Sequence, residues 1–197
     1  ASLVAIRKRN LKARLAYSTV SQLGYITMGA LLASPLGVIG STLHIAMHAF
    51  GKITLFFCAG AIIVATHKTE VQDMQGLGKH MPITMLAFAI ASLGIIGLPP
   101  AGGTWSKWFL LMATADTEHW LLMVILMLSS LLSIGYLLSV PLRAFFPNKE
   151  GDKELLPTSG RIDIAPSASL VAIVITTLAG IGLFFYADTI YQLAMKV

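Results

Sequence analysis

GSTLHIAMHAFGKITLFFCAGAII (residues 40–63) gives the strongest indication of the fold, because it is long and apolar enough to cross a lipid bilayer. A bilayer-spanning helix needs about 20 mostly apolar residues. Backbone polar groups in lipid have to be hydrogen-bonded within the segment, so this stretch is expected to form a helix. Three residues that can hold a proton interrupt its apolar character at four-residue intervals: His44, His48 and Lys52.

The three titratable residues share one face of the predicted helix. At about 100° and about 1.5 Å per residue, they drift by about 80° around the axis over a rise of about 12 Å. A charge near the bilayer centre costs at least ~2.5 kcal/mol on insertion scales, so such residues usually face a protein interior or a water-filled cavity. This face is therefore predicted to mark an ion route, with Lys52 as its central residue because it lies near the middle of the span.

Two other interpretations of this face stay open. The histidines can be neutral, hydrogen-bonded packing residues while the long stem of Lys52 reaches an interface. Histidines four residues apart, such as His44 and His48, can also bind a metal or haem. However, no carboxylate or cysteine completes a metal site, and no other span carries a central histidine to face them. No cofactor and no metal are therefore predicted.

The rest of the chain also has the composition of a membrane protein. Of its 197 residues, 56% are hydrophobic and 12% are charged, whereas soluble domains average about 25% charged residues. The predicted spans are residues 15–33, 39–66, 83–98, 105–115, 120–146 and 167–193. We expect one transmembrane domain over residues 1–197, with five or six crossings and a polar inter-helix loop at residues 147–166.

Charge and cysteine content narrow the range of partners. The formal net charge is +5. The basic residues lack the interleaved aromatic side chains of a nucleic-acid-binding face, so they suit lipid headgroups better than nucleic acid. The single cysteine, Cys58, excludes a disulfide within the chain. Because the sequence begins with Ala1 rather than Met, we expect a fragment or a processed piece of something longer.

SLGIIGLPPAGGTWSKWFLL (residues 92–111) predicts a helix that is broken within its length. Pro99 and Pro100 cannot continue the helical hydrogen bonding, and Gly102 and Gly103 do not favour its resumption. Broken helices at membrane depth line cavities, and their free backbone ends coordinate ions. Lys107 follows at once, so it lies in such a cavity if the break is at mid-depth, or is an interfacial anchor if the break is at the surface.

Hydroxyl groups gather in two further segments. In LKARLAYSTVSQLGYI (residues 11–26), Lys12 leads into a helix that carries Tyr17, Ser18, Ser21 and the amide of Gln22. The fifth predicted span carries Ser129, Ser130, Ser133 and Tyr136. Hydroxyls and an amide one turn apart either pack helices together or hold water in a relay. Packing is the simpler interpretation, and support of a water relay is the functional one.

Four stretches together, in this order, resemble the antiporter-like membrane subunits shared by respiratory complex I, Mrp-type cation/proton antiporters and membrane-bound hydrogenases. They are LKARLAYSTVSQLGY (residues 11–25), HIAMHAFGKITLFFCAG (44–60), GLGKHMPIT (76–84) and GLPPAGGTWSKWFLL (97–111). The resemblance implies an all-α polytopic membrane protein with about six transmembrane helices, one of them broken at Pro99-Pro100/Gly102-Gly103. It also implies that this chain holds the second of two inverted repeats and lacks the N-terminal half of the same fold.

The resemblance further implies a function and a set of residues. By this resemblance, Lys52 corresponds to the central lysine of the family, and His44 and His48 correspond to the histidines next to it. Lys107 corresponds to the charged residue at the end of the exit path. Lys12 matches, more weakly, a lysine at the start of its helix. The implied function is proton, or Na⁺/H⁺, translocation within a larger respiratory, hydrogenase or Mrp complex. The implied location is the cell (inner) membrane of a prokaryote, with other membrane subunits and the lipid bilayer as partners. No catalytic site is predicted, and the alternative is a structural or assembly subunit without its own ion path.

Overall fold

The computed structural model describes residues 1–146 and 167–196, which form helices without a named strand. The polar loop predicted at residues 147–166 lies outside the described residues. In chain order the elements are α1 (Ser2–Arg7), α2 (Leu11–Leu31), α3 (Pro35–Thr66), the 3₁₀ helix η1 (Val71–Met74), α4 (Leu77–His80), α5 (Pro82–Ile96), α6 (Gly103–Asp116), α7 (Trp120–Leu137), α8 (Ser139–Phe145), α9 (Ser167–Phe185) and α10 (Ala187–Ala194).

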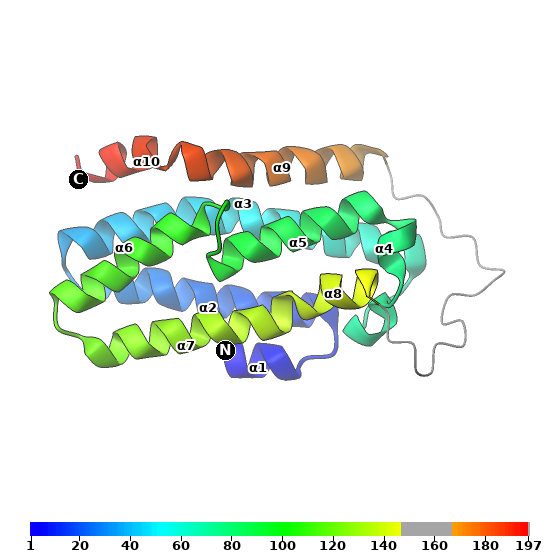
Figure 1. The fold of residues 1–197 in the computed structure, drawn as a ribbon, viewed down its shortest axis with the longest axis horizontal. Coiled ribbons are helices and arrows are strands. Elements are labelled where there is room, and N and C mark those ends of the chain that lie inside the picture. The colour runs from blue at the N-terminus through cyan, green and yellow to red at the C-terminus, as the bar shows by residue number, and fades with distance from the viewer. Residues whose placement is uncertain (147–166, 197) are drawn as a thin grey trace.

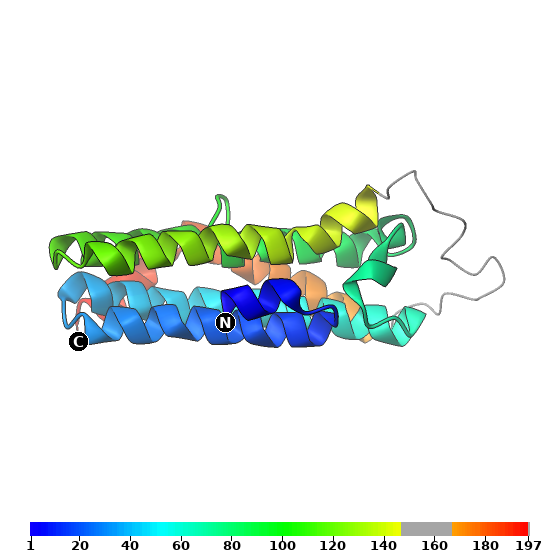
Figure 2. The same cartoon turned by 90° about the horizontal axis from the view of Figure 1, so that it is seen from below.

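The helices form an elongated bundle in which the long helices run roughly along one common axis (Figures 1 and 2). α3 is the central element and packs against α2, α5, α6 and α9. Every predicted span is helical, with α7 and α8 together covering the fifth and α9 and α10 together covering the sixth. The short elements α1, η1 and α4 have no counterpart among the predicted spans.

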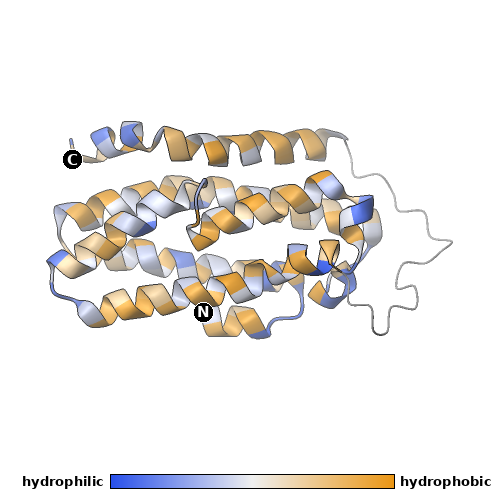
Figure 3. Ribbon diagram, viewed as in Figure 1, coloured by the Kyte–Doolittle hydropathy of each residue, from blue (hydrophilic) through white to orange (hydrophobic). Residues whose placement is uncertain are grey.

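The bundle carries apolar surface of the kind that lipid covers. In the described part of the chain, three helices are long and apolar enough to cross a membrane by length and composition: Pro35–Thr66, Trp120–Phe145 and Ser167–Phe185. Pro82–Ile96 is a shorter apolar helix. Apolar residues line much of these helices (Figure 3), and large ones such as Leu121 are exposed. The prediction of an all-α polytopic membrane protein is confirmed, while the number of crossings stays a prediction.

The predicted break between α5 and α6 is confirmed. α5 ends at Ile96, Gly97 has the left-handed φ of +93°, and α6 begins at Gly103. The two half-helices follow one another along the bundle, so the break lies well inside its length (Figure 1). A Cβ on Gly103 would lie 1.9 Å from the Gly94 carbonyl oxygen, and a Cβ on Gly97 would lie 2.8 Å from Cδ of Lys107. Side chains at either position would push the two half-helices or Lys107 out of place.

A close helix contact sets α2 against α3. A Cβ on Gly29 of α2 would lie 2.3 Å from Oγ of Ser41 on α3, and the Ser41 hydroxyl donates to the Ile26 carbonyl at 3.0 Å. Small residues allow two membrane helices to approach in this way. The contact fixes the register in which Ser18 and Gln22 of α2 meet the titratable face of α3.

Candidate functional site

Lys52 lies inside the bundle near the middle of α3, with only 5% of its surface exposed. Its ammonium group donates hydrogen bonds to the Leu15 carbonyl, at 3.2 Å, and to the Ser18 hydroxyl, both on α2. The ammonium is therefore satisfied by protein groups in the interior and does not extend to an end of the bundle.

His44 connects three helices from its position two turns before Lys52. It is 3% exposed. Its Nδ1 lies 2.9 Å from Oγ of Ser106 on α6, and its Nε2 lies 3.1 Å from Oε1 of Gln22 on α2. The Tyr25 ring meets the His44 ring edge-on, with the ring centroids 5.7 Å apart. Both ring nitrogens thus have a polar partner inside the bundle.

His48 lies between His44 and Lys52 on the same face of α3. The rings of His44 and His48 are stacked, with centroids 6.0 Å apart and an interplanar angle of 11°. Nε2 of His48 is buried and has no hydrogen-bond partner among the described residues. Lys52 lies within electrostatic range of His48, and Lys107 lies within electrostatic range of His44. The two histidines therefore lie between the two lysines.

Lys107 lies at the helix break, with 6% of its surface exposed. Its Nζ donates to the Ile96 carbonyl at 2.8 Å and to the Ser130 hydroxyl of α7 at 3.0 Å. The Ile96 carbonyl belongs to the last turn of α5, where carbonyls lack an intrahelical donor. Nζ also lies 5.1 Å from the centroid of the Tyr25 ring, within the range of a cation–π interaction. The broken helix thus supplies both the lysine and one of its hydrogen-bond acceptors.

Other polar atoms around these residues are buried but have no hydrogen-bond partner among the described residues. They are Nε2 of Gln22 and the hydroxyls of Tyr25 and Tyr136. The Tyr136 hydroxyl lies near Ser18 and Gln22, on the α2 side of the lysines and histidines. Buried polar groups are normally hydrogen-bonded, and water supplies the partners where protein does not. These atoms are able to bind water between Lys52 and Lys107.

The carboxylates of the described residues lie apart from this site. Each is in a connection, in a short helix or at a helix end: Glu70, Asp73, Asp116, Glu118 and Asp188. Within the described ranges, no group of three histidine, cysteine or acidic residues is placed to hold a metal ion. The site is therefore built from cationic, imidazole, hydroxyl and amide groups.

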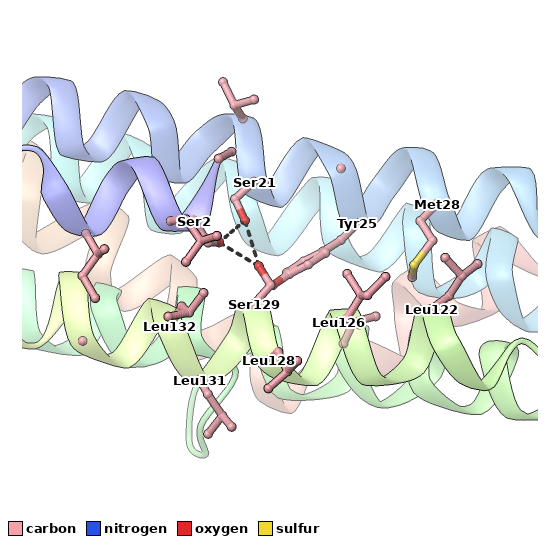
Figure 4. A pocket seen from close by; sticks show the side chains of 17 residues that line it. Ser2, Ser21, Tyr25, Met28, Leu122, Leu126, Leu128, Ser129, Leu131 and Leu132 are labelled. Carbon is pink, nitrogen blue, oxygen red and sulfur yellow. Dashed lines mark hydrogen bonds between the residues drawn. The ribbon is translucent and has the colours of Figure 1, made fainter.

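Of the remaining predicted site residues, only Ser18 contacts one of the lysines or histidines of the site. Ser18 joins the site through Lys52, whereas Lys12 and Tyr17 are exposed on α2. Ser133 is buried and donates to a carbonyl of its own helix. Ser21 bonds the hydroxyls of Ser2 and Ser129 in the wall of an apolar groove of about 860 Å³ between α1, α2 and α7 (Figure 4). That serine cluster packs three helices together.

Sequence reasoning did not identify all of the residues that surround the lysines. Gln22, Ser130 and Tyr136 were expected only as packing or water-relay groups, and Tyr25 and Ser106 had no predicted role, yet each of the five lies next to a predicted site residue. Ser106 carried a usable signal, because it directly precedes Lys107. The position of the Tyr25 ring beside Lys107 depends on how the helices pack.

The chain belongs to the NADH:quinone oxidoreductase/Mrp antiporter family. The family model described as "NADH:quinone oxidoreductase/Mrp antiporter, TM" matches residues 1–133. NADH-quinone oxidoreductase subunit N of Desulforudis audaxviator (strain MP104C) is 36% identical over 191 residues, which cover 93% of this chain and 38% of that protein. The chain therefore spans well under half the length of this relative.

Solved structures show the same fold. A chain of the Mrp complex from Dietzia sp. DQ12-45-1b superimposes with a TM-score of 0.86 at 21% identity, covering 98% of this chain and 43% of that one. A chain of the membrane-bound sulfane sulfur reductase, described as an archaeal respiratory membrane complex, gives a TM-score of 0.83 at 25% identity, covering 99% and 38%. The resemblance read from the sequence is thus confirmed at the level of family and fold.

Proposed function

We propose that this chain forms a proton-conducting half of an antiporter-like subunit and works within a larger respiratory or Mrp-type membrane complex of a prokaryote. The observation that carries the proposal is the burial of two lysines, Lys52 and Lys107, in the interior of a membrane bundle with two histidines between them. Intramembrane ionisable residues of this kind mark ion routes, because burying them is costly. The relatives named above are subunits of quinone oxidoreductase, Mrp and respiratory membrane complexes.

The proposed route runs from Lys52 through His48 and His44 to Lys107, or in the reverse direction. Burial away from water disfavours the charged form of a lysine, so a buried lysine both takes up and releases a proton readily. The unpartnered polar atoms of Gln22, Tyr25 and Tyr136 bind the water that completes the path. A change elsewhere in the complex that biases protonation of one lysine drives transfer, through coupling of linked equilibria.

The test is proton uptake into vesicles that contain the full-length protein in its complex. Lys52→Ala and Lys107→Ala are each expected to lower the rate at least ~100-fold, because they remove a group that carries the proton. Lys196→Ala is the matched control, since Lys196 is exposed near the end of α10 and is expected to leave the rate unchanged. Uptake at the original rate in Lys52→Ala would show that the proposed route is wrong.

A structural role for Lys52 is the second candidate, and one contact favours it. The ammonium of Lys52 joins α3 to the Leu15 carbonyl and the Ser18 hydroxyl of α2. If this contact served assembly alone, Lys52→Met would preserve transport but weaken the complex on blue-native gels. The proton-path proposal expects the opposite result, an assembled complex that does not transport.

A further inference from the structure

We infer that the Ser106 hydroxyl is a proton switch that exchanges a proton with Nδ1 of His44, and that Gln22 holds the other ring nitrogen of His44 in its protonated form. The inference rests on the proposed function, because it describes how a proton passes between His44 and the Lys107 side of the path. It assigns definite roles to two positioning residues, Ser106 and Gln22.

The hydroxyl of Ser106 has two acceptors within reach. Its Oγ lies 2.9 Å from Nδ1 of His44 and 3.1 Å from the carbonyl oxygen of Gly103, and the side chain is fully buried. A serine hydroxyl has one hydrogen, which rotates to suit its surroundings. Ser106 is therefore able to donate to Nδ1 or to the Gly103 carbonyl, and in the second orientation its oxygen accepts a hydrogen bond from Nδ1–H.

The opposite ring nitrogen is held by a different kind of partner. Nε2 of His44 lies 3.1 Å from Oε1 of Gln22, an amide that is fully buried. An amide oxygen accepts hydrogen bonds and does not donate them, so it fixes Nε2 as the protonated nitrogen. Nδ1 is then the basic nitrogen of the neutral ring, and it faces Ser106.

The ring itself is restrained, so the hydroxyl is the part that moves. His48 stacks on the His44 ring and Tyr25 meets it edge-on. The Gly103 carbonyl, which accepts the hydroxyl hydrogen in the second orientation, is also fixed. Gly103 packs so closely on Gly94 that no side chain fits there. Rotation about one C–O bond therefore changes the state of the site without movement of a helix.

One transfer moves a single proton from Lys107 to His44. In the neutral state the Ser106 O–H donates to Nδ1. A proton from the Lys107 ammonium, carried through water, forms a new O–H bond at Ser106 while the old O–H bond breaks and its proton forms Nδ1–H. His44 gains one proton, Lys107 loses one, and the new hydroxyl hydrogen points to the Gly103 carbonyl. Because Lys107 is then neutral, it no longer repels the imidazolium, and the remaining titratable neighbours on this face are His48 and Lys52.

Thr114 provides a matched control on the same helix. Its hydroxyl is fully buried and donates to the carbonyl of Leu111, three residues earlier, at 2.8 Å. This is the bond that helical serines and threonines commonly make with their own backbone. Ser106 makes the same bond to Gly103 but differs in facing an imidazole nitrogen.

The first experiment measures proton uptake into vesicles by the full-length protein in its complex. Ser106→Ala is expected to slow uptake at least ~10-fold, within the range that a positioned proton-transfer group contributes, whereas Ser106→Thr keeps the hydroxyl and restores most of the rate. Thr114→Ala is expected to match the wild type. Wild-type uptake in Ser106→Ala, or a Ser106→Thr variant no faster than Ser106→Ala, would overturn the inference. Lys52→Ala is measured alongside. If Lys52→Ala abolishes uptake while Ser106→Ala takes up protons at the wild-type rate, the proposed function stands and only the inference about Ser106 is wrong.

The second experiment observes His44 itself. In the full-length protein labelled with ¹⁵N-histidine, the resonance that disappears in His44→Gln reports which ring nitrogen carries the proton. The neutral ring is expected in the Nε2–H form in the wild type and in a mixture of the two forms in Gln22→Leu. A tautomer that is unchanged by Gln22→Leu would contradict the role of Gln22, whatever the transport rates show.

Discussion

Gly97 shows how a residue without a side chain makes room for a buried charge. Its φ of +93° is a conformation that other residues adopt at a cost of about 1–2 kcal/mol. An added Cβ would also lie 2.8 Å from Cδ of Lys107. Gly97→Ala is therefore expected to lower the melting temperature of the full-length protein in detergent and to slow proton uptake, because the Lys107 ammonium is pushed away from Ile96 and Ser130.

Gly60 is the control for this substitution. It lies within α3, and an added Cβ would have nothing within 4 Å. Gly60→Ala is expected to leave uptake unchanged and to keep or raise the melting temperature, because alanine is favoured over glycine in a helix. Equal behaviour of the Gly97→Ala and Gly60→Ala variants would show that the break does not depend on glycine at position 97.

The residues of the site were predictable to different degrees, for physical reasons. Lys52 was identified because an ionisable side chain in an apolar span has a cost that is visible from sequence alone. The contacts of Gln22 and Ser106 with His44 were not predicted, because buried hydroxyls and amides have many neutral roles in membrane helices. Their importance depends on which side chains face them, and only the packing of α2 and α6 against α3 brings both of them to His44.

At the level of elements, the contact between α2 and α3 depends on Gly29. An added Cβ there would lie 2.3 Å from Oγ of Ser41 and 2.4 Å from Cδ2 of Leu110. Gly29→Ala is expected to force α2 away from α3 and to destabilise the protein by about 1–3 kcal/mol, the usual cost of overpacking. The measurement is the shift of the unfolding midpoint of the full-length protein, together with proton uptake, since the same register holds Ser18 against Lys52.

Gly24 tests whether this effect comes from the contact rather than from the loss of a glycine. It belongs to the same helix, and an added Cβ would have nothing within 4 Å. Gly24→Ala is expected to be neutral or slightly stabilising. A Gly29→Ala variant as stable as Gly24→Ala would show that the two helices adjust without loss.

Elements with strong local signals were predicted, and short elements were not. The break between α5 and α6 follows from Pro99, Pro100, Gly102 and Gly103, which act on the backbone wherever the helix lies. The six-residue α1 and the four-residue α4 are too short for a periodic apolar pattern, and isolated helices of that length are unstable. They form because the bundle supplies partners, with Ala5 of α1 and Leu77 of α4 in the buried core.

In the described part of the chain, lysine and arginine residues are concentrated toward one end of the bundle. The end that holds the start of α2, α4 and α8 (Figure 1) also carries Glu70 and Asp73, but basic residues outnumber them there: Arg7, Lys8, Arg9, Lys12, Arg14, Lys79 and Arg143. At the opposite end, Asp116 is the last residue of α6 and Glu118 lies in the connection to α7. The order of charges in the sequence did not reveal this, because it depends on which connections share an end of the bundle.

This asymmetry predicts the orientation of the chain in the membrane. Connections rich in lysine and arginine stay on the cytoplasmic side, so the end with Lys79 is expected inside and the end with Asp116 outside. Cys58 is the only cysteine of this chain and is buried. A full-length protein in which Cys58 and any cysteine outside this chain are replaced by alanine therefore allows single reporters at two exposed positions, Lys79→Cys and Asp116→Cys. In intact cells that produce the full-length protein, a membrane-impermeant maleimide is expected to label Asp116→Cys at once and Lys79→Cys only after permeabilisation. The reverse pattern would place the basic end outside, and protons entering the path from the cytoplasm would then start from the opposite end of the bundle.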